Sequence, residues 1–122
     1  MSAGSEAVVY LEKIQRNFDG HSALSREAEA LRLAFLGGVG GPETSGAMLR
    51  SLQRFAEQAA HEVIDAQTRR GPKPKDPGTY KTSIFKCLAD YEKCCLTHDW
   101  RLCGALVAVC IAKQLIPFAP RG

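Results

Sequence analysis

Apolar residues recur at steps of three and four along most of the chain, which is the pattern of amphipathic helices. The clearest stripes fall in residues 5–18, 22–36 and 43–70. Ser5 is the expected N-cap of the first helix, and Thr44 or Ser45 is the expected start of the third. No alternating pattern longer than a few residues indicates a strand, so the chain is expected to be all-α.

Residues 80–118 are the most apolar stretch, and they hold all five cysteines and the only tryptophan. The stretch can form two helices folded back near His98-Asp99, with Thr97 or Asp99 capping the second. One continuous helix over residues 82–115 is the alternative, because residues 96–99 contain neither glycine nor proline. We favour the hairpin, since a single helix would spread its apolar residues over all sides.

The expected fold is therefore an all-α bundle of four to five helices with a C-terminal cysteine-rich helical hairpin. Glycines in residues 37–42 and prolines in residues 71–79 interrupt the helical pattern. These breaks predict one domain over residues 1–122, with a three-helix layer at 5–70, a Pro/Lys linker at 71–79 and the hairpin at 80–118. The tail, residues 117–122, should lie over the surface. The hairpin residues expected to be mostly buried are Leu88, Tyr91, Leu102, Leu106, Val109 and Cys110.

The cysteine spacing predicts which thiols meet. Cys87 and Cys94 are seven apart, as are Cys103 and Cys110, so each pair lies along one face of its helix. A turn between His98 and Asp99 would place Cys94 opposite Cys103 and Cys87 opposite Cys110. Two cross-helix disulfides would then be possible about 10 Å apart, too far for one metal held by all four thiolates. Cys95 is left over.

This arrangement resembles the twin-cysteine helical hairpins of small mitochondrial intermembrane-space proteins. The six intervening residues differ from the nine or three usual in that family, so no function follows from the resemblance. The N-terminus lacks the pattern of a secretory signal, which predicts an intracellular, most simply cytoplasmic, protein. Thiols there stay reduced, so buried, unbonded cysteines are the expected state.

Overall composition excludes few functions. The chain has 122 residues, 45% of them hydrophobic, and a net charge of +3, which demands neither a nucleic acid nor a membrane as partner. The apolar run over residues 102–116 is short for a membrane span and contains Lys113 and Gln114, so no span is expected. The glycine-rich residues 37–42 follow a helix and lack the ending of a phosphate-binding loop.

The string from Cys94 to Asp99 resembles the Cys-Cys-x-x-His-Asp signature of secreted phospholipases of the A2 class. The resemblance implies His98 as general base and Asp99 as calcium ligand. However, the family's calcium loop is missing upstream, and no carboxylate follows Asp99 to orient the histidine. A nucleophilic or redox pair of Cys94 or Cys95 with His98 is a second possibility, because these residues lie within one helical turn.

Arg69, Arg70, Lys73 and Lys75 form the most basic stretch of the chain. The stretch loosely resembles an AT-hook, although it has Arg-Gly-Pro where that motif has Gly-Arg-Pro. Contacts from these four side chains to phosphates would make the chain a nucleic-acid-binding accessory protein.

The sequence thus gives three hypotheses about function. We expect a small non-enzymatic interaction or adaptor protein that binds a protein partner or associates with itself. The alternatives are nucleic-acid binding through the basic stretch, and a hydrolase or thiol-redox protein centred on Cys94, Cys95 and His98. No catalytic, cofactor or metal site is assigned.

Overall fold

The computed structural model describes residues 2–18, 22–37, 41–69 and 77–118. These ranges contain helices and no strand, which confirms the predicted all-α class. The elements are α1 (Ala3–Asn17), α2 (Ser22–Phe35), α3 (Ser45–Arg69), α4 (Pro77–Cys95), α5 (Trp100–Leu115) and a 3₁₀ turn, η1 (Ile116–Phe118).

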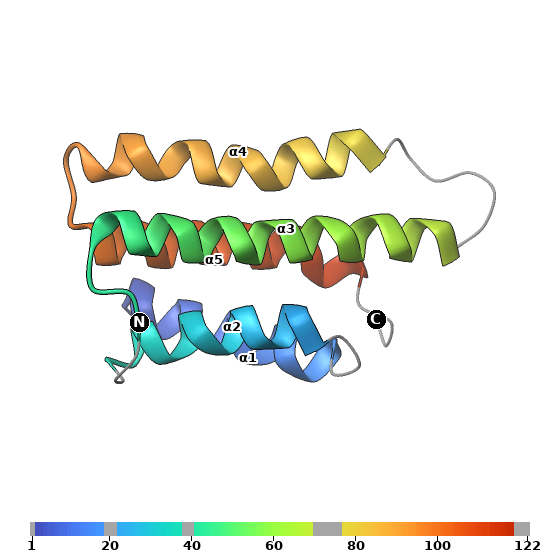
Figure 1. Ribbon diagram of the computed structural model, residues 1–122, viewed down its shortest axis with the longest axis horizontal. Coiled ribbons are helices and arrows are strands. Elements are labelled where there is room, and N and C mark those ends of the chain that lie inside the picture. The colour runs from blue at the N-terminus through green and yellow to red at the C-terminus, as the bar shows by residue number, and fades with distance from the viewer. Residues whose placement is uncertain (1, 19–21, 38–40, 70–76, 119–122) are drawn as a thin grey trace.

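Helix α5 is the centre of the bundle. Figure 1 shows α4 along one side of the α3 and α5 pair, with α1 and α2 along the other. Helix α5 packs on α1, α3 and α4, and α3 packs on α2 and α4. In the described ranges α4 touches neither α1 nor α2, so α5 and α3 connect the two sides.

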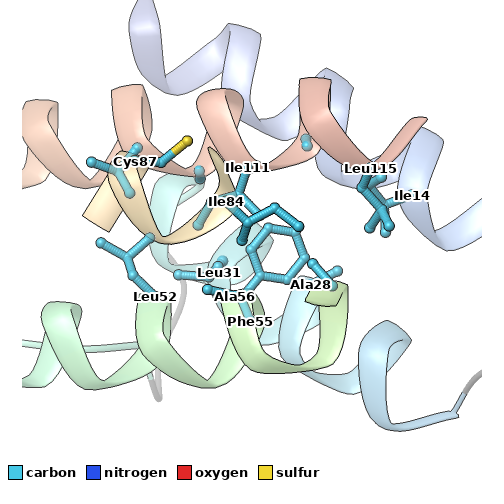
Figure 2. Close-up of a cluster of buried hydrophobic side chains, with 14 of the residues drawn as sticks. Ile14, Ala28, Leu31, Leu52, Phe55, Ala56, Ile84, Cys87, Ile111 and Leu115 are labelled. Carbon is cyan, nitrogen blue, oxygen red and sulfur yellow. The ribbon is translucent and has the colours of Figure 1, made fainter. Parts of the chain in front are cut away.

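Each of the five helices sends fully buried side chains into one core. Figure 2 shows Ile14, Leu31, Phe55, Ile84 and Ile111 in this cluster, one from each helix in order. None of them is accessible to solvent. Burying a side chain of this size stabilises a fold by about 1.5–3 kcal/mol, so the apolar stripes account for the assembly of the helices.

The caps of the first and third helices follow from short polar side chains. Ser2, and not the predicted Ser5, caps α1, because its hydroxyl accepts a hydrogen bond from the Ser5 N–H at 3.2 Å. The helical pattern therefore begins two residues earlier than predicted. Thr44 Oγ1 accepts from the Ala47 N–H at 3.0 Å, so Thr44 caps α3.

The cysteine-rich stretch is a helical hairpin, and the alternative of one continuous helix is wrong. Helix α4 ends at Cys95, α5 begins at Trp100, and the turn covers His98-Asp99 as predicted. The carbonyl of Cys94 accepts from the N–H groups of Thr97 and His98, which closes the end of α4. Asp99 occupies the N-cap position of α5 without a side-chain capping bond.

Two predicted boundaries are wrong. Helix α4 begins at Pro77, inside the predicted linker, because proline is tolerated in the first turn of a helix. The rest of that linker, residues 71–76, lies outside the described residues. Phe118 was expected in a surface tail, but η1 turns its side chain into the core.

The prediction that Leu102 and Leu106 are mostly buried is also wrong. Leu102 is 37% exposed and Leu106 is 48% exposed, whereas Tyr91 and Val109 are buried as predicted. Leu88 and Cys110 are half-buried, as are many residues at the edge of a core. The reason is tertiary: α5 is apolar on all sides, but its neighbours cover only the faces that meet α1, α3 and α4.

One helical stretch of the described chain, Trp100–Phe118, is long and apolar enough to cross a membrane. Of its apolar window, 56% is buried inside the bundle. A core helix passes the same test of length and composition, so the predicted absence of a span stays a prediction.

Candidate functional site

Two disulfides join α4 to α5 in the register that the spacing predicted. The Sγ atoms of Cys87 and Cys110 are 2.02 Å apart, and those of Cys94 and Cys103 are 2.11 Å apart. The expectation that these four thiols are unbonded is therefore wrong for this structure. Cys95 is left as a free, half-buried thiol, as the count implied. The hairpin is fixed covalently at two levels along its length.

The residues from Cys94 to Asp99 lie at the end of α4 and in the turn before α5. The Cys94 sulfur is bonded to Cys103. His98 is exposed, and its Nδ1 lies 2.8 Å from the Thr97 hydroxyl rather than beside a carboxylate. The part of the chain that the structure describes also holds no group of three His, Cys, Asp or Glu side chains that could bind a metal.

Cys95 lies beside Tyr91 at the end of α4. Burial raises the pKa of the Tyr91 hydroxyl, and the Cys95 thiol adds to the increase, whereas the hydrogen bond with Ser45 opposes it. The hydroxyl donates to the Ser45 carbonyl at 2.8 Å. This contact links the end of α4 to the start of α3, and it gives Tyr91 a structural role.

The basic residues proposed for nucleic-acid contacts are not placed. Arg69 is the last residue of α3, and its side chain is outside the described set. Arg70, Lys73 and Lys75 lie outside the described residues altogether. The hypothesis therefore stays a prediction.

A groove of about 470 Å³ runs along α5 beside the first half of α1. We call it the α1/α5 groove. Its lining consists of Ala3 and Glu6 from α1 and, from α5, Leu106, Val109, Cys110, Lys113 and Gln114. Leu102 lies one turn before Leu106 on the same face, since residues four apart on a helix are neighbours. The groove thus continues into the uncovered apolar face of α5.

Two lysines and a tyrosine mark one end of the α1/α5 groove. The Lys13 and Lys113 Nζ atoms lie 5.2 and 5.7 Å from the centre of the Tyr10 ring. Each distance fits a cation–π contact. Lys13 and Tyr10 belong to α1 and Lys113 to α5, so the ring connects the two helices that border the groove.

Polar contacts with α2 hold α1 in place. Glu29 of α2 accepts from the side-chain amide of Gln15 at 2.7 Å, and Arg32 donates to both carboxylate oxygens of Glu29. Arg32 also lies 3.9 Å from the Glu12 carboxylate on α1. The hydrogen bond from Arg32, followed by that from Gln15, lowers the pKa of Glu29 to about 2. The α1 side of the groove is therefore supported by a charged network on its far side.

Sequence reasoning missed this groove because it assigned Leu102, Leu106, Val109 and Cys110 of α5 to the core. Lys113 was a usable signal. Leu102, Leu106 and Lys113 share one helical face, at i, i+4 and i+11, and a lysine is almost never fully buried.

Comparison of the chain with protein families, curated proteins and solved structures finds no match in any of the three.

Proposed function

We propose that this protein is a non-enzymatic helical interaction protein that binds a protein segment in the α1/α5 groove. The observation that carries the proposal is the exposure of Leu102 and Leu106 on the helix that otherwise forms the bundle centre. Single exposed leucines are ordinary, but two on one face beside an apolar groove form a contiguous patch.

The hairpin suits such a role because it presents this patch on a stiff support. Disulfides at Cys87–Cys110 and Cys94–Cys103 hold α5 in fixed register with α4. A preorganised surface loses less entropy on binding, which favours affinity. The support comes from the two disulfide bonds and therefore requires that the four cysteines stay oxidised.

The enzyme alternatives have less support. A thiol nucleophile at Cys94 would first need reduction of its bond to Cys103. A base at His98 would need an orienting group, and its ring neighbour is the Thr97 hydroxyl. Nucleic-acid binding concerns side chains outside the described set, so no observation favours it over the groove.

The two disulfides also indicate the kind of cellular compartment in which the protein acts. Such bonds persist in oxidising surroundings and are rare in the cytosol. The proposal therefore includes an oxidising compartment as the place of action, in contrast to the cytoplasm predicted from the N-terminus.

Site-specific cross-linking tests the proposed function. A photoreactive phenylalanine analogue replaces Leu106 in one variant and Leu33 in another, and each is irradiated in native extract. Leu33 is a matched control, because it is 37% exposed, like Leu102, and lies on α2 away from the groove. We expect a discrete adduct from position 106 only. It should disappear when Leu102→Asp is added and persist with Leu33→Asp. Equal adducts from both positions would reject the groove as the binding surface.

A further inference from the structure

Two exposed lysines lie together at one end of the α1/α5 groove. Lys13 and Lys113 approach the same Tyr10 ring, and both are exposed. Over residues 2–18, 22–37, 41–69 and 77–118, neither forms an ion pair with a carboxylate. The two cations lie 5.2 and 5.7 Å from the centre of one ring, so a carboxylate that approaches this ring is attracted by both. This end of the groove is complementary to a negative group.

Away from Lys113 and Gln114, the α5 side of the groove is apolar, and carboxylates lie on its α1 side and beyond its far end. From Lys113 the face of α5 leads past Val109, which is largely buried at the floor of the groove, to the exposed Leu106 and Leu102, about 16 Å along the helix axis. Asp99, which is exposed, stands beyond Leu102, and Glu6 lines the α1 side. Glu6 and Asp99 therefore repel a carboxylate on the bound segment, whereas Lys13 and Lys113 attract one at the other end.

We propose that the occupant of the α1/α5 groove is an amphipathic helix of a partner protein that carries a carboxylate one turn beyond its apolar anchors. Its apolar side chains at i, i+4 and i+7 lie on Leu102, Leu106 and Val109, the spacing with which helices bind in grooves. The carboxylate binds Lys13 and Lys113. This inference rests on the proposed function, because it specifies the chemistry of the segment that the groove holds.

Two synthetic peptides test the charge requirement. Both are alanine-based helices with leucines at i, i+4 and i+7; one carries two glutamates in the following turn, and the other carries two lysines there. Fluorescence anisotropy with the full-length oxidised protein gives both affinities. We expect the acidic peptide to bind about tenfold more tightly or better, as two surface ion pairs permit. Equal affinities, or no binding of either peptide, would overturn the inference.

Charge reversal tests whether Lys13 and Lys113 cause the preference for the acidic peptide. In Lys13→Glu/Lys113→Glu the order of the two affinities should invert. The matched control is Lys86→Glu/Lys93→Glu, which makes the same change in net charge at two exposed lysines of α4. The control should keep the preference of the unmodified protein. A similar loss in both variants would assign the effect to net charge and overturn the inference.

Two further measurements separate the occupants and the two proposals. In sedimentation of the protein alone we expect no dimer that depends on Leu106. A dimer that Leu106→Asp abolishes would make a second copy of the chain the occupant of the groove and would overturn the inference. The cross-link at position 106 tests whether any protein binds the α1/α5 groove, and it does not depend on the charge of the bound segment. A discrete, Leu102-dependent adduct with no peptide preference would retain the proposed function and reject only the acidic helix.

Discussion

At the scale of single residues, Gly104 allows α5 to approach α3 closely. A Cβ atom at position 104 would lie 2.8 Å from Sδ and 2.9 Å from Cγ of Met48. Met48 is buried, so its side chain has little room to move away. Glycine in a helix costs about 1 kcal/mol relative to alanine, and the close contact explains why that cost is tolerated here.

Gly104→Ala should destabilise the protein by about 1–3 kcal/mol, because overpacking outweighs the gain in helix propensity. Gly46→Ala is the control, since position 46 is exposed and its new Cβ would meet only the end of Arg50 at 3.6 Å. That control should be neutral or stabilising. Urea unfolding measures both. A stabilised Gly104→Ala variant would show that Met48 can move aside.

Glu29 should give the protein a specific acid sensitivity. Its pKa is about 2 in the folded protein against an ordinary 4.5. The ionised carboxylate therefore makes its full contribution to the free energy of unfolding above pH 4.5. The contribution is lost as the pH falls from 4.5 towards 2. The difference in unfolding free energy between the unmodified protein and Glu29→Gln should therefore narrow over that range.

The matched test of this prediction removes the main cause of the low pKa. In an Arg32→Gln background the pH-dependent part of the Glu29→Gln effect should be smaller, because Arg32 is the first cause of the lowered pKa. Urea unfolding at a series of pH values gives the comparison. A difference that stays constant from pH 6 to pH 2 would contradict the assignment.

At the scale of elements, α5 carries a covered and an uncovered face. Ile111 is fully buried where the five helices meet, while Leu106 is about half exposed on the same helix. The expectation that Leu102 and Leu106 belong to the core came from the apolar composition of the hairpin. Neighbouring helices decide which apolar face is covered.

Alanine substitutions should separate the two faces of α5. Ile111→Ala should cost about 2–5 kcal/mol through lost burial and a cavity. Leu106→Ala should cost no more than about 1 kcal/mol, well below the value for a core leucine, because half of its surface already meets water. Urea unfolding of the oxidised protein measures both. Equal losses would place Leu106 in the core after all.

The hairpin of α4 and α5 should depend on its disulfides. The Cys87–Cys110 bond spans a sequence separation of 23 residues, and the chain-entropy model assigns a loop of that size about 3 kcal/mol. Cys87→Ser/Cys110→Ser should lower the free energy of unfolding by about that amount. Cys95→Ser, which touches neither bond, should change it little.

Peptide mapping gives an independent check of the same element. In the native, unreduced protein only Cys95 should react with an alkylating reagent, because the other four thiols are bonded. Joined peptides should contain Cys87 with Cys110 and Cys94 with Cys103. A peptide joining Cys87 to Cys94 would contradict the register.

At the scale of the whole molecule, the net charge of +3 leaves nucleic-acid binding as a measurable alternative. If Arg69, Arg70, Lys73 and Lys75 contact phosphates, replacing all four by glutamine should flatten the dependence of log affinity for duplex DNA on log salt. The change should be about 0.9 per lost contact. A salt titration by anisotropy checks this. An unchanged slope, or no binding at low salt, would remove the alternative.

The sequence by itself determined the helices and the cysteine register. Periodic apolar stripes predicted the helices because an amphipathic helix repeats every 3.6 residues, and that period is visible without neighbours. The spacing of Cys87, Cys94, Cys103 and Cys110 predicted the pairing for the same reason, since a short hairpin turn leaves little freedom in register.

Only the tertiary structure decided which apolar residues remain exposed. Leu102, Leu106 and Ile111 look equivalent in the sequence, because α5 is apolar on all sides. Packing of α1, α3 and α4 covers Ile111 and leaves the two leucines at the surface. The α1/α5 groove and the Lys13–Tyr10–Lys113 cluster join residues about 100 positions apart. Local periodicity carries no information about such contacts, because they depend on which helices pack together.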